Sequence, residues 1–421
     1  MLTREENDLL TRVGPGTPMG DLLRRYWQPV CVAGELTADH PVKRVQVLGE
    51  ELVAFRDSTG RYGLLGEHCS HRGTSLYYGF LEDGGLRCPY HGWLYDASGR
   101  CIEQPFEPAQ SMMKHTIRHP AYPVETLGGL LFAYMGPPET KPLLPRWDVL
   151  VWEDGQRTIR LQETLECNWL QAQENSADVT HTYFLHAHTL KLRGLKGGDY
   201  FYRPFEQYGF QPFEFGLIKT WRYAADGRLS AEVGGGNPLI FPNILRQQSG
   251  AWHNMHWRVP IDDTRTNIIV VNFRRNVDGH REEQPEFPPV EFTPETLPNG
   301  EYAMDSFFGQ DKMAWETQGR IVDRSAEHIG ASDHGIALVR RMLLEQIKVV
   351  QQGGDPMGTI RDPERNRIVE LPGWFVMDSQ DILEGRSATG RELVSSDGVF
   401  DDRYVAYDVP VGAARVPRAG S

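Results

Sequence analysis

Two short runs that each combine a cysteine with a histidine constrain this chain more than any other feature. The run CSH at 69–71 is followed, after sixteen intervening residues, by CPYH at 88–91. Both lie in a stretch, from Pro41 to about Met135, where short β-type segments alternate with Gly, Pro and Asp-Gly turns. This stretch is therefore predicted to be a small, loop-rich antiparallel β-domain in which each loop can supply one thiolate and one imidazole.

Two kinds of metal centre could use these four side chains. In a Rieske [2Fe–2S] centre one iron takes both cysteines and the other both histidines, which here means Cys69 with Cys88 and His71 with His91. A structural zinc ion accepts the same Cys₂His₂ set. A zinc finger usually pairs cysteine with cysteine and histidine with histidine, however. The mixed pairs, each followed closely by glycine, favour the cluster.

A second set of candidate ligands lies further along the chain. Asn175, Asp178 and His181 recur every three positions, so a helix places them along one side. His186 follows five residues after His181, about 140° further round an ideal helix, so the helix must end or distort for both imidazoles to meet one metal. Non-haem Fe(II) oxygenases use two histidines and a carboxylate on one face of the iron. The pair is therefore a candidate for two of these three ligands.

The third ligand is predicted to be Asp311. It stands among Met304, Phe308 and Trp315 at helical spacings, so a carboxylate would lie inside an apolar stripe. A buried carboxylate needs a partner, and a metal ion supplies one. The alternative is an ordinary aspartate on a helix surface, and Asp305 is the second choice for the ligand.

Composition narrows the function classes. The net charge of −13 without a basic stripe argues against a nucleic-acid partner. Five cysteines are too few, and odd in number, for a secreted disulfide framework. The opening MLTREENDLL lacks the apolar core of a signal peptide, and no stretch approaches the roughly 18 apolar residues of a membrane span. A cytoplasmic protein without a membrane partner is expected.

A proline-rich stretch at 136–145 indicates a connection between domains. It divides the chain into 1–150, with the metal-binding β-domain, and 151–421, with the second ligand set and a turn-rich tail. The second unit is expected to be α+β. Its predicted helices cover 165–183, 302–328 and 335–350, and its predicted strands cover 217–223, 252–259 and 266–273.

Taken together, the CSHRG and CPYHGW loops, the N-x-x-D-x-x-H-x-x-x-x-H run and the late aspartate resemble the α-subunits of Rieske aromatic-ring hydroxylating oxygenases. The segments LTREENDLLTRVGPGTPMGDLLRRYWQPV and QDKMAWETQGRIVDRSAEHIGASDHGI are similar to the phthalate 4,5-dioxygenase branch. The resemblance implies an α+β fold: an N-terminal Rieske β-domain and a C-terminal catalytic domain with an antiparallel sheet flanked by helices, of the helix-grip or START-like kind.

The resemblance also implies an assembly. The subunits are expected to form a head-to-tail homotrimer, or a hexamer of two trimers, in which the cluster of one subunit lies near the iron of the next. By position, Asp178 bridges His181 and the neighbouring subunit's His91, and Asn175 lies beside the iron. Such carboxylates orient a ligand and tune the metal.

The implied activity is that of a terminal oxygenase component. Electrons come from NADH through a reductase, with FMN and a ferredoxin-type [2Fe–2S] cluster expected in it, and O₂ hydroxylates an aromatic substrate, expected to be a small carboxylate of the phthalate or benzoate type. The first alternative is a Rieske monooxygenase that removes O- or N-methyl groups or hydroxylates another small molecule. The second is an electron-transfer protein, which would hold one metal centre instead of two.

Substrate-binding residues are harder to assign. A carboxylate calls for a cation, and Arg246 in FPNILRQQ is the first candidate, with Lys219 and Arg222 behind it, although all three could be surface charges. Gln211 follows the YGF step at 208–210, where the resemblance places an arginine, so one carboxylate contact is expected to be missing. The candidates for aromatic walls, for which core packing is the commoner fate, are Phe184, Trp252 and Phe307.

Overall fold

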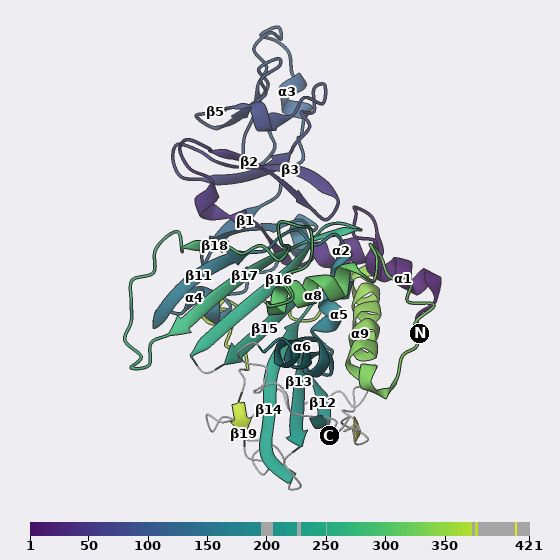
Figure 1. The fold of residues 1–421 in the computed structure, drawn as a ribbon. Helices are drawn as coiled ribbons and strands as arrows, with labels where there is room; N and C mark the ends of the chain where they lie inside the picture. The colour runs from purple at the N-terminus through teal and green to yellow at the C-terminus, as the bar shows by residue number, and fades with distance from the viewer. Residues whose placement is uncertain (195–204, 225–228, 250, 373–374, 378–408, 411–421) are drawn as a thin grey trace.

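The computed structural model describes residues 1–194, 205–224, 229–249, 251–372, 375–377 and 409–410, and the chain forms two lobes (Figure 1). The upper lobe in that view holds two small antiparallel sheets, of order β2-β3-β4 and β5-β6-β7-β8. A third sheet, β1-β10-β9, lies where the lobes meet, since β1 contacts both β2 and β16. The strands of these sheets are β1 Trp27–Val32, β2 Val42–Val47, β3 Glu50–Arg56, β4 Tyr62–Gly66, β5 Phe80–Glu82, β6 Gly85–Arg87, β7 Leu94–Tyr95, β8 Cys101–Glu103, β9 Val124–Leu127 and β10 Leu130–Tyr134.

Continuous apolar runs explain the central strands of this region. All five residues of β10, LLFAY, are buried, as expected for a strand covered on both faces. The β2–β3 hairpin turns at Leu48 and Gly49, both with positive φ, and their amides donate to the carbonyls of Pro260 and Ile261. The hairpin tip is therefore hydrogen-bonded to strand β16 of the lower lobe, which ties the two lobes together.

The lower lobe is built on one large sheet of order β18-β11-β17-β16-β15-β14-β13-β12-β20, with β19 paired to β14. Neighbouring strands are antiparallel except that β18 runs parallel to β11. The predicted strands at 217–223, 252–259 and 266–273 correspond to β13, β16 and β17. The strands are β11 Gly155–Leu161, β12 Phe205–Phe213, β13 Gly216–Ala224, β14 Leu229–Ile240, β15 Ile244–Ser249, β16 Trp252–Asp262, β17 Arg265–Arg275, β18 Val290–Phe292, β19 Phe375–Met377 and β20 Val409–Pro410.

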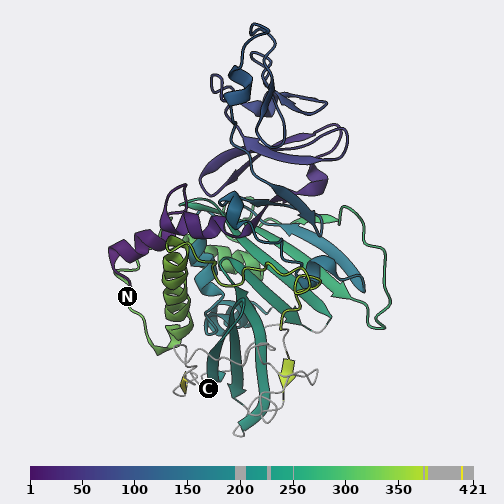
Figure 2. The ribbon, with the colours of Figure 1, turned by 180° about the vertical axis from the view of Figure 1, so that it is seen from behind.

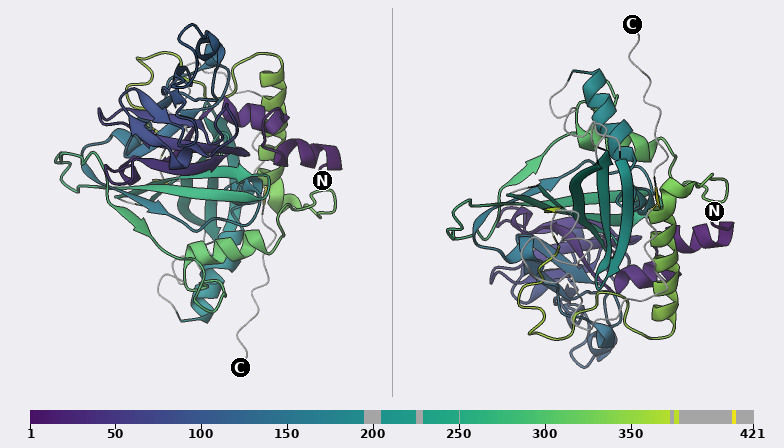
Figure 3. Two further views of the ribbon diagram at one scale, coloured as in Figure 1. Left: turned by 90° about the horizontal axis from the view of Figure 1, so that it is seen from above. Right: turned by 90° about the horizontal axis from the view of Figure 1, so that it is seen from below.

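Helices cover this sheet along its flanks. Figure 2 shows the arrangement from behind, and Figure 3 shows α9 and the two N-terminal helices side by side along one flank. The α-helices are α1 Arg4–Thr11, α2 Pro18–Arg24, α3 Met113–Thr116, α4 Asp148–Val151, α5 Trp169–Asn175, α6 Thr189–Leu192, α8 Phe307–Glu316 and α9 His334–Gln351. The remaining helical turns are η1 Ala33–Glu35, η2 Leu76–Tyr78, η3 Pro138–Thr140, the π-helix η4 Thr182–His188 and η5 Ala331–Asp333.

Two predicted helices differ from the observed ones. The helix expected over 165–183 is only α5, after which the chain turns before the π-helix η4. The helix expected over 302–328 is only α8, because Ser306 caps its start and Gly319, at φ +93°, follows its end. No helix among the described residues is both long and apolar enough to cross a bilayer.

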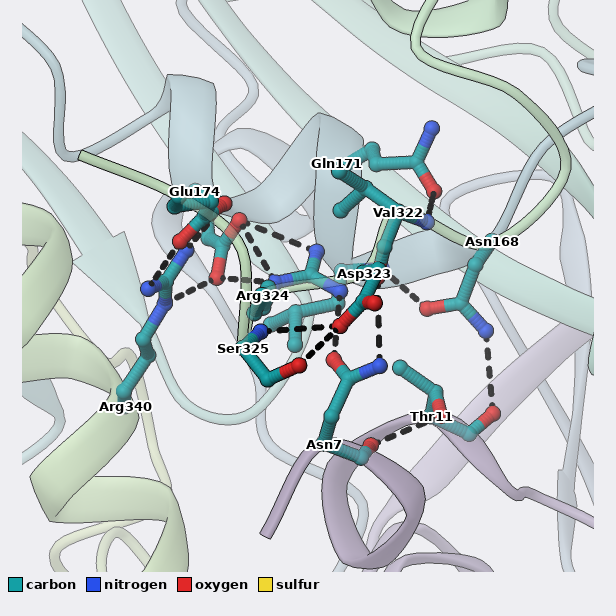
Figure 4. Close-up of polar contacts among 12 residues, drawn as sticks. Asn7, Thr11, Asn168, Gln171, Glu174, Val322, Asp323, Arg324, Ser325 and Arg340 are labelled. Atoms are coloured by element: carbon teal, nitrogen blue, oxygen red, sulfur yellow. Dashed lines mark hydrogen bonds and ion pairs between the residues drawn. The ribbon is translucent and has the colours of Figure 1, made fainter. Parts of the chain in front are cut away.

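A buried polar cluster fastens the N-terminal helices to the lower lobe (Figure 4). Arg324 donates to both oxygens of Glu174 on α5 and to the side chain of Asn7 on α1, and Arg340 on α9 donates to Glu174 and to Glu327. These bonds join α1, α5 and α9, and α5 carries Asn175 of the second ligand set. The first helices of the chain therefore pack on the lower lobe, and the division near residue 150 stays a prediction.

Candidate metal centres and active site

The two Cys/His runs fold into loops with the same backbone pattern. In each loop the amide four residues after the cysteine donates to the cysteine carbonyl, from Gly73 to Cys69 at 2.8 Å and from Gly92 to Cys88 at 3.1 Å. Both glycines have positive φ, 76° and 75°. The two loops can therefore approach one centre in the same way, each with its cysteine first.

The two cysteines and the two histidines of these loops differ in burial. Cys69 and Cys88 are buried in the apolar cluster of the upper lobe, whereas the rings of His71 and His91 lie at its surface with centroids 4.6 Å apart. Burial raises the pKa of the Cys88 thiol, and the neighbouring Cys69 thiol raises it further. Two adjacent buried thiols beside two imidazoles fit a cluster with one cysteine-bound and one histidine-bound iron.

Sequence analysis missed two groups that surround this site. The hydroxyl of Tyr95 on β7 lies 3.2 Å from Cys69 Sγ. His119 is held by Ser70 Oγ at 2.8 Å and by the Gly66 carbonyl at 2.7 Å, beneath the first loop. Neither residue stands at a recognisable spacing from the cysteines, so the fold alone reveals them.

The second ligand set converges on one point. Candidate ligand atoms of His181, His186 and Asp311 all lie within 4.8 Å of one another. The π-helix η4 accounts for the spacing of five between the two histidines, because its hydrogen bonds span five residues and its turn is wider than that of an α-helix. The distortion that the sequence requires for two histidines at this spacing is therefore present.

Asp311 reaches the pair from helix α8. Its Oδ1 lies 3.4 Å from His186 Nε2, is buried, and has no hydrogen-bond partner among the described residues. An unpartnered carboxylate oxygen beside two imidazoles is the donor set of a mononuclear iron site with open positions. These residues fit Fe(II), and their role as its ligands stays a prediction at this point.

Gln310, which sequence analysis also missed, orients His186. Its Oε1 lies 2.8 Å from His186 Nδ1, while its Nε2 donates to the Met304 carbonyl at 2.8 Å, which fixes the amide orientation. Since an amide oxygen only accepts, the hydrogen of the neutral imidazole is on Nδ1 and the lone pair is on Nε2, toward Asp311. The only signal in the sequence is the position next to Asp311.

Asp178 and Asn175 lie at the start of the same segment. Asp178 Oδ1 accepts the amide of Thr180 at 2.8 Å, and Oδ2 lies 3.5 Å from His181 Nδ1. Burial alone would raise the pKa of Asp178, but His181 and Thr180 together lower it to about 2. Asp178 is thus ionised and lies beside His181, whose Nδ1 has no hydrogen-bond partner among the described residues, and Asn175 lines the adjoining cavity.

The three converging residues open onto a cavity of about 340 Å³ between the sheet, η4 and α8. Strand β16 contributes alternate residues to its wall, as a strand must. These are Trp252, Asn254, His256 and Arg258. The aromatic candidates Trp252 and Phe307 line the cavity, and the Phe307 ring lies 4.9 Å from the His186 ring.

The structure corrects the first choice of substrate cation. Arg246 is 1% exposed and points to the other face of β15, where it pairs with Asp148 at 3.3 Å and lies 2.8 Å from His253 Nδ1. Its neighbours Leu245 and Gln247 line the cavity instead. Arg246 was chosen for its charge alone, and neighbouring residues of a strand point to opposite faces.

Two other substrate candidates also lie outside the wall. Phe184 is 64% exposed, and Gln211 on β12 is not among the lining residues. Of the reserve cations, Lys219 lines the cavity, while the side chain of Arg222 is outside the described part of the chain. Arg258, which the sequence did not single out, is the second cation of the wall.

Comparison with known proteins agrees with this architecture. Residues 26–123 match the family model of the Rieske [2Fe-2S] domain, and residues 295–373 match that of the LigXa C-terminal domain like family. The chain is 39% identical to the 5,5'-dehydrodivanillate O-demethylase oxygenase subunit of Sphingobium sp. (strain NBRC 103272 / SYK-6), over 92% of this chain and 90% of that protein. It is 40% identical to the phenoxybenzoate dioxygenase subunit alpha of Ectopseudomonas oleovorans, over 83% and 86%.

Solved structures show the same fold at lower identity. NdmA of Pseudomonas putida CBB5 superposes with a TM-score of 0.58 at 20% identity, covering 79% of this chain and 93% of that chain. The terminal oxygenase of carbazole 1,9a-dioxygenase from Nocardioides aromaticivorans IC177 gives 0.58 at 20% identity, covering 82% and 97%. With relatives this similar over most of its length, the chain belongs to the Rieske non-haem iron oxygenases.

Proposed function

We propose that this oxygenase hydroxylates a small aromatic carboxylate with iron held by His181, His186 and Asp311. The observation that carries the proposal is the convergence of these three side chains at the wall of a 340 Å³ cavity, with a buried carboxylate oxygen left unpartnered. Cys69, Cys88, His71 and His91 are proposed to hold the [2Fe–2S] cluster. The units 1–150 and 151–421 are then the electron-carrying and the catalytic part.

When bound, the cluster supplies single electrons and the mononuclear iron supplies the activation of O₂. The chain's own residues position the reactants. Gln310 keeps the hydrogen of His186 on Nδ1, so that Nε2 faces the ligand position. Phe307 offers an aromatic wall beside that position, which orients a substrate ring and displaces water from the site, and Trp252 lines the cavity further along β16.

The separation of the two candidate centres between the lobes supports electron transfer between subunits. Strand β5, between the two cluster loops, lies in the upper lobe, while α5 and α8 lie in the body of the lower one (Figure 1). A head-to-tail homotrimer, or a hexamer of two trimers, would bring the cluster of one subunit beside Asp178 of the next. Asp178, already placed against His181, would bridge the two centres.

The electron donor is proposed to be an NAD(P)H-dependent reductase with FMN and a ferredoxin-type cluster. A complex of oxygenase and ferredoxin among the solved structures of carbazole 1,9a-dioxygenase, at a TM-score of 0.55, offers an analogy for such a partner. A cytoplasmic location remains the expectation from the sequence.

O-demethylation is the second candidate reaction. It is favoured by the O-demethylase subunit that matches 92% of this chain. Both reactions would use the same iron ligands and cavity, so they differ in the product rather than in the residues.

The test is a single turnover. The iron-loaded protein is reduced chemically, freed of reductant, and mixed with ¹⁸O₂ and a panel of benzoates with and without methoxy groups. Ring products labelled with ¹⁸O support hydroxylation, and formaldehyde with a free phenol supports demethylation. The absence of any oxidised product from fully loaded protein would contradict the proposal.

Electron transfer between subunits has its own test. Subunits carrying His91→Ala are mixed with subunits carrying Asp311→Ala under conditions that exchange subunits. Each variant alone should be inactive, and the mixture should regain turnover, because an intact cluster then faces an intact iron site. A mixture that forms mixed oligomers but stays inactive would contradict electron transfer between subunits.

A further inference from the structure

Arg258 and Lys219 distinguish the cavity from every other buried charged site in the described part of the chain. The charged side chains at its wall, leaving the histidines aside, are these two cations and Asp311. Arg258 comes from β16 and Lys219 from β13, so two strands supply the positive charge. Both residues are buried, at 2% and 7% exposure.

The guanidinium of Arg258 has no hydrogen-bond acceptor among the residues that the structure describes. Its Nε and Nη1 are buried without a hydrogen-bond partner, and no described carboxylate lies within ion-pair distance. Each of the other buried arginines in the described chain has at least one carboxylate or carbonyl oxygen as partner. These are Arg24, Arg25, Arg157, Arg246, Arg324 and Arg340.

Lys219 is buried as well. It forms no hydrogen bond or ion pair within the described residues. Burial lowers the pKa of Lys219 to about 8, with Asp178 and Asp311 acting against the effect, and burial lowers the pKa of Arg258 to about 9. Arg258 therefore stays positively charged at neutral pH.

Unpartnered buried cations are unfavourable for folding. A charge removed from water without a counterion or hydrogen bonds costs stability, and such groups persist where function requires them. The carboxylate of Asp311 is committed to the metal position in the proposed function. The remaining requirement at Arg258 and Lys219 is for an anion with oxygen acceptors, presented from inside the cavity.

We propose that Arg258, assisted by Lys219, is the specificity-determining anchor for the carboxylate of the aromatic substrate. This inference rests on the proposed function and names the residues that select its substrate. A guanidinium matches a carboxylate with two parallel hydrogen bonds, and the aromatic ring would then lie in the cavity on the side of Phe307. Burial and Arg258 lower the pKa of neighbouring His256, so it adds no positive charge to the site at neutral pH.

The test compares charge, with shape held constant. Dissociation constants of benzoate and phenoxybenzoate, and of their neutral amides, are measured on oxidised, iron-loaded protein without reductant, by calorimetry or tryptophan fluorescence. The wild-type protein should bind each anion about 10-fold or more tightly than its amide. Arg258→Met should weaken binding of the anions about 10- to 100-fold and leave the amides nearly unchanged.

Three further variants calibrate the result. Arg258→Lys should keep part of the anion selectivity, because the charge remains without the two-bond geometry, and Lys219→Met should lose a smaller part of it. Arg281→Met is the matched control, since Arg281 is 82% exposed on the surface beside Glu153. It should leave every dissociation constant unchanged.

Thermal unfolding separates a binding role from a structural one. Arg258→Met should keep or raise the Tm, since it removes an unpartnered buried charge, whereas Arg324→Met should lower it, since it leaves Glu174 short of a partner. A wild-type protein that does not prefer anions to amides, including one that binds neither, overturns the proposal. So does an Arg258→Met variant with a lowered Tm and equal losses for both ligand types.

The proposed function can fail independently. Selective anion binding without oxidation of any carboxylate would reject the reaction and keep the anchor. Oxidation of neutral arenes, with anion and amide bound equally, would reject the anchor and keep the oxygenase reaction.

Discussion

Single side chains decide the chemistry at both centres. Asp311 differs from an ordinary helix aspartate because its Oδ1 is buried beside His186 without a hydrogen-bond partner among the described residues, and a metal ion would satisfy that oxygen. The neighbouring Gln310 determines which nitrogen of His186 is free to bind. Spacing and residue type in the sequence were enough to propose the histidines and Asp311, which the fold brings together, but Gln310 and Tyr95 act through contacts that no spacing records.

Removal of the hydrogen bond between Gln310 and His186 is predicted to lower the affinity for iron. Gln310→Leu removes the acceptor for His186 Nδ1–H, so the imidazole loses its fixed tautomer and orientation. We expect a fall in affinity for the mononuclear iron of about 10- to 100-fold. The measurement is competition of the iron-loaded protein with a chelator, and Gln318→Leu, at an exposed position after the same helix, is the control that should bind iron normally.

Tyr95 predicts a change in cluster potential. A cluster-bound thiolate has no hydrogen, so the Tyr95 hydroxyl at 3.2 Å must donate to Cys69 Sγ. Donors to sulfur stabilise the more negative, reduced cluster. Tyr95→Phe should therefore lower the reduction potential in a redox titration followed by EPR, while Tyr78→Phe, at an exposed position in the same lobe, should not. An unchanged or raised potential in Tyr95→Phe would refute the donor role.

At the scale of elements, the π-helix η4 is the decisive local structure. The sequence required a distortion because an ideal α-helix turns His186 away from His181, but it could not specify a π-helix, whose wider turn depends on packing against α8. The direction of the arginine side chains was the second limit. No strand was predicted around Arg246, and which of Arg246 and Arg258 faces the cavity depends on the register of β15 and β16.

Deletion of Phe184 tests the π-helix. Phe184 is exposed and lies between the two histidines, so its removal shortens their spacing to four and allows the segment to close into an α-helix. We expect loss of the mononuclear iron with the cluster retained. Phe184→Ala keeps the spacing and should keep the iron, so equal iron contents in the two variants would contradict this account of η4.

At the scale of the whole molecule, long-range contacts place the catalytic helices. Glu174, one residue before Asn175, binds Arg324 and Arg340, which come from segments 150 and 166 residues further along the chain (Figure 4). The sequence indicated the strands of both lobes from apolar runs, and the resemblance supplied their arrangement. It could not reveal that α1 joins the lower lobe, because the Asn7–Arg324 bond connects residues 317 positions apart.

The buried polar cluster around Glu174 predicts how the stability of the protein depends on pH. Burial would raise the pKa of Glu174, but Arg324 and Arg340 lower it below its usual value of about 4.3. Its contribution is therefore complete above the unfolded-state pKa and is lost as the pH falls through the lower folded-state pKa. Glu174→Gln should cost about 3–5 kcal/mol near pH 7, seen as a lower Tm, and the difference from wild type should shrink below about pH 4.

The control for that prediction is Glu166→Gln. Glu166 pairs with Arg320 at an exposed position, where removal of the charge should change the Tm little. A Tm difference between Glu174→Gln and wild type that stays constant from pH 7 to pH 4 would show that the charge of Glu174 is not what stabilises the cluster.

The most direct test of two separate metal centres is the iron and acid-labile sulfide content of anaerobically purified protein, wild type beside Asp311→Ala. The wild type should hold about three irons and two sulfides per chain, and Asp311→Ala about two of each, because the cluster ligands are untouched. Three irons in Asp311→Ala would remove Asp311 from the ligand set, and zinc without sulfide in the wild type would contradict the cluster itself.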